Sequence, residues 1–499
     1  MKSFSLIILF IIIVLVALAG CAVGPDFHSQ NMATPSLYTA TPLPSQTVNT
    51  PSDSGAAQRF VFAKDLPAQW WTLFHSEALD QLIRQALSES PTLELAKAKL
   101  RESLENRKAQ VGALFPSVDA DVSVARQKMS GASFGEPNMD IDPFTLINAS
   151  VNVSYTFDIF GGTRRQMEAL QAQIEYQQFQ LEGAHLTLTA NIVTAAIQEA
   201  SLRAQINLTI DIIEAEQKQL DVLKKQFELG AVSKMAVLSQ ETELAMTKAG
   251  LPLLEKQLDM TRHALSVLIG KFPGEGKMPE FSLDSLHLPE SLPVSLPSLL
   301  AHQRPDIRAS EALLHQACAA VGVATANLYP QITLSGGYGF QATSTDVLFS
   351  GQSIVWNLGA GLLQPIFHGG ELTAKRRSAI AAYDQAVAQY RQTILKAFQD
   401  VADVLRALET DARTLHAQSQ AEAAAKTALA LTEKQYELGA VSYLSLLIAE
   451  RDYQNTHINV ITARAQRYAD TAALFQALGG GWWNRKTISA NPPLEKTGI

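Results

Sequence analysis

The sequence predicts a mainly helical protein that also contains four β-strands, and three observations support this fold class. The 499 residues form a tandem duplication of a unit of about 210 residues. Each half contains an uninterrupted stretch of about 67 residues with the composition of a single helix. Each half also contains segments in which apolar and polar residues alternate, which is the pattern of a half-buried strand.

The duplication is visible in short motifs that recur at a nearly constant offset. Phe227-Glu-Leu-Gly-Ala-Val-Ser233 returns as Tyr436-Glu-Leu-Gly-Ala-Val-Ser442, about 209 residues later. Pro91 in the first half matches Pro305 in the second. We therefore expect the same order of elements in both halves: a short helix, two strands, a very long helix and a returning helix.

The short helix and the strands come first in each half. A helical pattern covers 91–115, with proline in the first turn where its missing N–H does no harm. Strands are expected at about 117–129 and 147–158 in the first half, and at about 331–341 and 353–364 in the second. In the second of these strands, apolar residues at odd positions alternate strictly with polar residues at even positions.

The long helices are expected at 163–229 and 371–438, and each would be about 100 Å long. Return helices are expected at 233–269 and 442–478. A return helix and the short helix of the same half together approach the length of the long helix. We therefore expect them to stack end to end along it, with a bend in the first return helix at Pro252.

The N-terminal 20 residues have the pattern of a signal peptide that ends in a lipobox. Lys2 precedes an apolar stretch, and Leu18-Ala-Gly-Cys21 resembles the bacterial lipobox, whose cysteine is acylated and becomes the first mature residue. An ordinary signal with an incidental cysteine is the alternative. The segment 21–58, rich in Ser, Thr and Pro, would be a lipid-anchored linker. Cys318, the second of two cysteines, is expected to be a small buried residue.

Composition and motifs argue against several classes of function. The chain carries 40 Lys and Arg against 48 Asp and Glu, a formal charge of -8, which argues against nucleic-acid binding. The histidines show neither the His-Glu-x-x-His pattern nor a Cys/His ligand spacing. We therefore expect no catalytic residues, no metal site, no cofactor and no enzymatic activity.

Four strands of about twelve residues could cross a bilayer, but they could not close into a barrel within one chain. Three chains would supply twelve strands and twelve helical staves. The expected assembly is a trimeric twelve-stranded β-barrel continued by an α-helical barrel, which is a hollow conduit. The alternative from the residues alone is a soluble sandwich attached to a coiled coil.

Four segments of the chain resemble segments of the bacterial outer membrane efflux protein family, the TolC-like outer membrane factors. The resemblance is to the lipoprotein, NodT-type branch of that family. The four segments are Cys21-Ala-Val-Gly-Pro-Asp-Phe27, Trp70-Trp-Thr-Leu-Phe74, Arg304-Pro-Asp-Ile-Arg308 and Gln476-Ala-Leu-Gly-Gly-Gly-Trp482. The resemblance covers nearly the whole chain. It departs at 75–77, where His-Ser-Glu replaces the acidic-proline pair expected there.

The resemblance implies an outer membrane duct of a tripartite efflux system that exports small toxic compounds or drugs. Its partners would be two further copies of the chain, a periplasmic adaptor, an inner-membrane transporter of the RND type, and outer membrane lipid through acylated Cys21. Its tunnel would extend into the periplasm of a Gram-negative bacterium. The alternatives are the duct of a protein-secretion system and a lipid-anchored periplasmic scaffold without a channel. The expected parts are repeats at 59–270 and 304–481, an equatorial linker at 271–303 and a C-terminal tail at 482–499.

Two further sets of residues are expected to serve the duct. The turns after the long helices should dock the adaptor, through Gly230, Val232, Ser233, Gly439, Val441 and Ser442. Arginines at the starts of the long helices, where the helix dipole disfavours cations, should meet lipid phosphates at the membrane edge. These are Arg164, Arg165, Arg376 and Arg377.

The resemblance also places a periplasmic constriction at the start of the return helices, where the family often carries carboxylates. In this chain the matching positions are Ala236, Ser445 and Ile448, which cannot ionise. We expect a constriction formed by Tyr436, Ser445, Leu447 and Ile448. It should resist block by multivalent cations and respond little to pH between about 4 and 6. Glu450 and Asp452 would restore the acidity if the helix were rotated.

Overall fold

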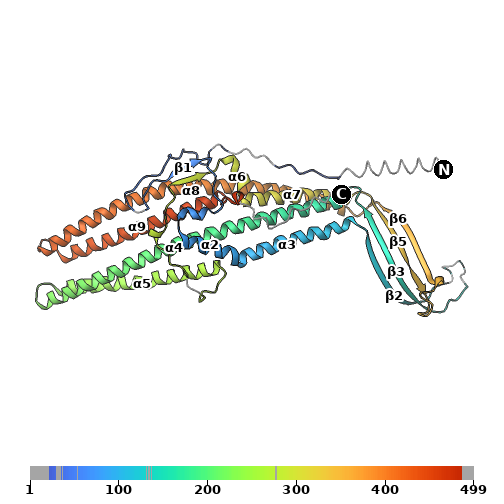
Figure 1. Cartoon of the computed structure of the whole chain (residues 1–499), viewed down its shortest axis with the longest axis horizontal. Coiled ribbons are helices and arrows are strands. Elements are labelled where there is room, and N and C mark those ends of the chain that lie inside the picture. The colour runs from blue at the N-terminus through green and yellow to red at the C-terminus, as the bar shows by residue number, and fades with distance from the viewer. Residues whose placement is uncertain are drawn as a thin grey trace. The chain divides into compact units, whose positions relative to one another are not determined.

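The computed structural model describes residues 22–485 except 30–34, 36, 53, 131, 133–134, 136–137 and 276–277. Cys21, the predicted signal peptide and the residues after 485 lie outside the described part. The chain forms two compact units, and Figure 1 shows their elements. The strand unit comprises Met1–Gln30, Lys99–Gln177 and Ser310–Tyr390, and the helical unit comprises Asn31–Ala98, Gln178–Ala309 and Arg391–Ile499.

The strand unit contains the four expected strands in one antiparallel sheet. Their order is β2-β3-β5-β6, so β2 and β6 are the two edges. β3 begins three residues earlier than the alternation predicted, because Phe144, Thr145 and Leu146 pair with the end of β2. The strands are β2 (Ser117–Gln127), β3 (Phe144–Phe157), β5 (Gln331–Ala342) and β6 (Ile354–Leu363).

The two faces of this sheet differ in chemistry. One face carries large apolar side chains that are mostly exposed within the chain, among them Val122 at 76%, Trp356 at 74% and Leu358 at 83%. The other face carries mostly Asp, Asn, Gln, Ser, Thr and Gly, with apolar residues, among them Leu146, Val355 and Leu363, toward the ends of the strands. Such an extended exposed apolar surface needs a cover, either lipid or protein.

The predicted long and returning helices are present, and their ends differ from the prediction by at most one residue. Both long helices contain 67 residues, and both return helices contain 35. The first return helix continues through Pro252 without a break. These helices, together with the short helix of each half, are α3 (Pro91–Val111), α4 (Gly162–Glu228), α5 (Lys234–Leu268), α7 (Pro305–Ala326), α8 (Glu371–Glu437) and α9 (Tyr443–Ala477). Two further helices, α2 (Glu77–Glu89) and α6 (Pro297–Gln303), precede α3 and α7.

The return helices end against the starts of the short helices, as the stacking hypothesis requires. Gly270 follows α5, and a Cβ at this position would lie 2.6 Å from the carbonyl oxygen of Glu89, just before α3. Gly479 follows α9 in the same way, and its Cβ would lie 2.7 Å from the carbonyl oxygen of Gln303, just before α7. Both junctions therefore require a residue without a side chain.

A second sheet joins two distant segments of the helical unit. β1 (Arg59–Phe62) pairs in parallel with β4 (Ser291–Val294). The sequence analysis missed both strands, because each is four residues long and Pro293 argues against a strand. Beside them, buried Arg467 of α9 donates to the carbonyl oxygens of Ser54 and Ala56. These bonds attach the N-terminal segment to the middle of the helical unit.

Cys318 is a buried free cysteine, as the sequence analysis expected. Its thiol donates to the carbonyl oxygen of Pro25 at 3.7 Å. In the part of the chain that the structure describes, we find no helix with the length and hydropathy needed to cross a membrane.

Candidate functional site

The two turns that end the long helices are built in the same way. After α4, the N–H of Ala231 bonds the carbonyl of Gln226; after α8, the N–H of Ala440 bonds the carbonyl of Gln435. Each of these bonds is the 6→1 hydrogen bond of a Schellman motif, which requires a residue in the left-handed conformation just before its donor. Gly230 and Gly439 occupy that position, with φ of 76° and 73°. The turns are therefore set by helix capping.

The return helices also start alike. Ser233 and Ser442 are N-caps whose hydroxyl oxygens accept from the backbone N–H of Ala236 and Ser445. At each tip one leucine is almost fully exposed, Leu229 at 85% and Leu438 at 84%. The tips thus present a large apolar side chain beside a glycine, on a backbone held by caps.

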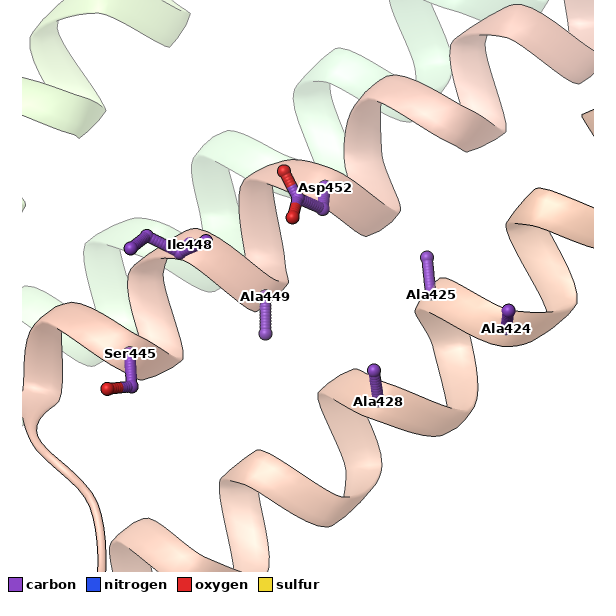
Figure 2. Close-up of a pocket in the computed structure, with 7 residues that line it drawn as sticks. All are labelled: Ala424, Ala425, Ala428, Ser445, Ile448, Ala449 and Asp452. Atoms are coloured by element: carbon purple, nitrogen blue, oxygen red, sulfur yellow. The ribbon is translucent and has the colours of Figure 1, made fainter.

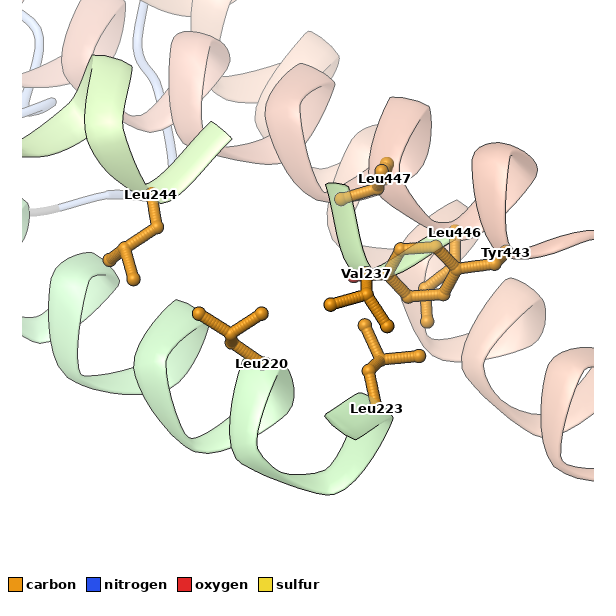
Figure 3. Packing of buried hydrophobic residues seen from close by; sticks show 7 residues of the cluster. All are labelled: Leu220, Leu223, Val237, Leu244, Tyr443, Leu446 and Leu447. Atoms are coloured by element: carbon orange, nitrogen blue, oxygen red, sulfur yellow. The ribbon is translucent and has the colours of Figure 1, made fainter. Parts of the chain in front are cut away.

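Behind the tips, an apolar cluster joins the α4–α5 hairpin to α9 (Figure 3). Tyr436 of α8 and Ala236 of α5 pack against it, and the Tyr436 ring lies 5.6 Å from that of Tyr443. Ala236 and Tyr436 therefore pack against the same apolar cluster, and position 236 contributes no carboxylate to it. The cluster comprises Leu220, Leu223, Val237, Leu244, Tyr443, Leu446 and Leu447.

A buried polar chain crosses the same junction. The hydroxyl of Tyr443 donates to the amide oxygen of Gln240, and the amide nitrogen of Gln240 donates to the carbonyl of Glu216 at 3.1 Å. The side chain of Glu216 accepts from Thr247 at 3.1 Å. Helices α4, α5 and α9 are thus linked by hydrogen bonds that the sequence analysis did not anticipate, since no short motif marks them.

The predicted constriction residues lie in two different environments. Leu447 is 9% exposed in the apolar cluster, whereas Ile448 is 43% exposed. Ser445 and Ile448 line a shallow pocket of about 350 Å³ between α8 and α9, with Ala424, Ala425 and Ala428 on the α8 side (Figure 2).

The structure also separates the two nearby carboxylates. Asp452 is exposed and lines the same pocket as Ser445 and Ile448, so these three share one stripe of α9 (Figure 2). Glu450 instead turns into the bundle. Burial raises the pKa of Glu450 to about 7, nearby Glu433 and Glu216 add to the increase, and a hydrogen bond to Gln219 opposes it.

The four predicted membrane-edge arginines also differ. The carboxylate of Asp158 accepts from the backbone of Arg164 at 2.9 Å and from its guanidinium at 3.3 Å. Arg165 is 5% exposed and is used within the chain, pairing with Asp26 at 2.6 Å and Glu168 at 2.7 Å. Arg376 and Arg377 are exposed.

Arg165 helps to seat the segment that follows Cys21. The N–H of Val23 donates to Phe160 at 3.0 Å, and the guanidinium of Arg165 donates to the carbonyl of Val23 at 3.3 Å. The Phe27 ring stacks on His315 at 4.4 Å. The segment that begins at Ala22 is therefore held beside the end of β3 and the start of α4.

Nothing in the described residues suggests a reaction centre. No group of three or more His, Cys, Asp or Glu side chains there could hold a metal ion. The strongest geometric features are a sheet with one apolar and one polar face, and paired helices with capped tips. These features define a class of membrane channel with a long helical extension.

The comparisons with known proteins identify the family. The sequence model of the outer membrane efflux protein family matches residues 82–271 and 296–480. The chain belongs to this family, as its sequence motifs indicated. A similar protein is the pyoverdine export outer membrane protein OpmQ of Pseudomonas aeruginosa, 31% identical over 83% of this chain and 87% of that protein. The cation efflux system protein CusC of Escherichia coli is 27% identical over 94% of this chain and 97% of its own length.

Solved structures agree with this assignment. The outer-membrane channel OprN has a TM-score of 0.82 and 27% identity, covering 93% of this chain and 100% of that one. The Campylobacter jejuni CmeC outer membrane channel has a TM-score of 0.80 at 21% identity, covering 92% and 95%, which shows the fold alone. The expected fold class is confirmed, and the chain is an outer membrane efflux channel.

Proposed function

We propose that this channel is a passive trimeric duct, closed as a twelve-stranded barrel and continued by a helical tunnel through the periplasm. The observation that carries the proposal is the four-stranded sheet with two unpaired edges and an exposed apolar face, since lipid cannot satisfy an open edge. The purified full-length protein should have the mass of three chains and conduct ions in a planar bilayer. A monomer without conductance would favour the scaffold alternative.

The duct is also a lipoprotein, acylated at Cys21. Support comes from the lipobox and from the next residues, which are held within the chain by Phe160 and Arg165. Mass spectrometry of the mature N-terminus should find acyl chains on Cys21 and on its amino group. An unmodified N-terminus, or one that begins elsewhere, contradicts this assignment.

Its partners are a periplasmic adaptor, which docks at the two tips, and an inner-membrane transporter of the RND type. The tips support this role because Leu229 and Leu438 are exposed there beside open glycine positions. The double variant Gly230→Asp with Gly439→Asp should abolish drug resistance at normal protein level. Gly274→Asp, at another open glycine, is the control. If the double variant keeps drug resistance, the proposal that the tips dock the adaptor is wrong.

The exported cargo is a class of small toxic compounds or drugs. Support comes from relatives named for efflux, including the toluene efflux pump outer membrane protein TtgC of Pseudomonas putida, 28% identical over 94% of each chain. The protein-secretion alternative predicts that a deletion strain loses an extracellular protein and keeps its drug resistance. Drug accumulation assays and analysis of secreted proteins in one deletion strain distinguish the two.

At the periplasmic end we propose a constriction formed by Ser445 and Ile448, with Tyr436 and Leu447 packed behind them. The exposed stripe that these two residues form on α9 supports the assignment. Asp452 lies on that stripe, about one helical turn farther along. Because Ser445 and Ile448 themselves carry no charge, the wild-type trimer should resist block by micromolar trivalent cation from the periplasmic side, and Ile448→Asp should introduce block. Strong block of the wild type that Asp452→Asn removes would place the carboxylate ring at Asp452.

Lipid phosphates at the membrane edge are proposed to meet Arg376 and Arg377, which are exposed, and Arg164, which is half-buried and paired with Asp158. Arg165 does not face lipid in this proposal; its bonds to Val23 and Asp26 hold the segment that follows Cys21 in place. Arg376→Gln with Arg377→Gln should weaken binding of the purified trimer to vesicles that contain anionic lipid. Unchanged binding would show that these arginines face solvent and do not contact lipid phosphates.

A further inference from the structure

The polar face of the four-stranded sheet carries charge of one sign. The four strands are fully described, and their charged residues are Asp119, Asp121 and Arg126. Asp119 and Asp121 alternate with apolar Val118, Ala120 and Val122, so both carboxylates lie on the polar face. Arg126 has the opposite parity and lies at the end of β2, where its guanidinium donates to Thr145 at 3.4 Å. The polar face therefore bears two carboxylates and no cation.

Amide side chains extend this face at the same level. Asp119 pairs in register with Asn152, Asn152 with Gly337, and Gly337 with Asn357. A Cβ at Gly337 would lie 2.3 Å from the side-chain oxygen of Asn357 and 2.9 Å from that of Asn152. The glycine thus leaves room for two asparagines that converge over it, and the whole row is polar across four strands.

The next row is polar on β2 and β3 and ends at Val355 of β6, which pairs with Gly339. Asp121 pairs with Ser150, and Ser150 with Gly339. The amide of Asn148 donates to the Asp121 carboxylate at 3.3 Å, which shows that the two side chains share a face. The amide of Asn148 is neutral, so it does not offset the charge of the carboxylate that it contacts. Nothing on this face of the strands neutralises either aspartate.

We propose that Asp119 and Asp121 are the ion-selectivity residues of this channel, so that the strand-lined part of the duct favours cations and neutral compounds over anions. The inference rests on the proposed trimeric duct, in which the polar face lines the lumen. Threefold symmetry then gives two adjacent rings, each with three carboxylates, at the level of the converging asparagines. Rings of Asp or Glu are a general means by which pores select cations.

The predicted constriction near the helical tips differs from the strands because its own positions carry no carboxylate. The predicted constriction positions Ala236, Ser445 and Ile448 are neutral, and Glu450 turns into the bundle. Asp119 and Asp121 therefore carry the proposed selectivity, and Asp452, the carboxylate near the constriction, is tested separately below. The chemical class of cargo that this favours is cationic or uncharged at neutral pH.

The test is the reversal potential of the reconstituted full-length protein across a KCl gradient. At about 1 M salt the Debye length is about 3 Å, so only charges that line the lumen contribute strongly. The wild type should prefer K⁺ over Cl⁻. Asp119→Asn with Asp121→Asn should lower the permeability ratio several-fold, and Asp119→Lys with Asp121→Lys should invert the preference. Asp140→Asn with Asp142→Asn removes two charges from the β2–β3 loop and should leave the ratio unchanged.

Each other outcome has a definite meaning. If the paired Asp→Asn variant keeps the wild-type ratio and Asp452→Asn loses it, the strands do not select and the proposed duct stands. An equal loss in the loop control also overturns the assignment to the strands. If the wild-type protein does not conduct at all, the proposed duct itself is wrong. Size-exclusion chromatography with light scattering shows that each variant keeps the oligomeric state of the wild type before recording.

Discussion

The tips of the two helical hairpins have the same backbone and different interiors. Gly230 and Gly439 have nearly the same φ, and both return helices start from a serine cap. Leu238 and Leu447 occupy equivalent positions in the duplication, yet Leu238 is 46% exposed and Leu447 is 9% exposed. Capping is local and survives duplication, whereas burial depends on which neighbours each copy meets.

The largest difference between the two tips should appear in the loss of stability caused by Leu447→Ala and by Leu238→Ala. Removing the buried leucine leaves a cavity in the apolar cluster and should cost about 2–5 kcal/mol of unfolding free energy. Replacing the exposed Leu238 by alanine should lower the unfolding free energy by less than about 1 kcal/mol. Chemical denaturation of both purified variants in the same detergent measures the difference. Equal losses would mean that the assembled protein buries both positions alike.

The second largest effect on stability is expected from removing the hydroxyl of Tyr443. Tyr443→Phe leaves the buried amide oxygen of Gln240 without its donor, which should cost about 1–3 kcal/mol. The equivalent position in the first half is Lys234, exposed at the surface, and Lys234→Met should have little effect. A Tyr443→Phe variant as stable as the wild type would show that water replaces the lost donor.

The glycines offer a test in which the two tips should behave alike. Among the described residues, no atom lies within 4 Å of a Cβ built at Gly230 or Gly439. Alanine at either position therefore meets strain in φ alone, about 1–2 kcal/mol. Gly→Asn at the same sites should cost less, since Asn tolerates the left-handed region. Unequal losses for the two alanine variants, measured by denaturation, would reveal a contact made in one tip only.

The smallest expected difference concerns pH. Glu450 and Glu241 are equivalent in the duplication, but Glu241 pairs with Lys224 at 3.0 Å near the surface. The folded-state pKa of Glu450 is raised from 4.5 to about 7. Its protonated form is therefore favoured by folding, and the associated stability is present below about pH 4.5 and lost as pH rises through 7.

The melting temperature should accordingly fall by a few degrees between about pH 5 and pH 8. Glu450→Gln should flatten this dependence, and Glu241→Gln should leave it as in the wild type. A slope that persists in Glu450→Gln assigns the titration to another carboxyl. Asp411, whose pKa is raised by burial and by its hydrogen bond to Asp470, is then the next residue to test.

Local patterns were sufficient to predict much of the fold. The ends of the long helices came within one residue because glycine and serine mark them, and strict alternation located the four strands. The β1–β4 pair was missed because its partners are far apart in the chain and each is short. The role of Arg165 was missed for the same reason, since Asp26 and Val23 reach it only in the folded chain.

The sequence by itself determined the duplication, the helices with their caps, the two-faced strands and the family, because each of these depends on neighbours within a few residues or on a recurring motif. Only the tertiary structure decided which copy of each repeated residue is buried. It turned Leu447 and Glu450 inward and left Ile448 and Asp452 on the surface stripe. The physical reason is that burial and hydrogen bonding are set by contacts between helices, and the same short sequence makes different contacts in each half of the chain.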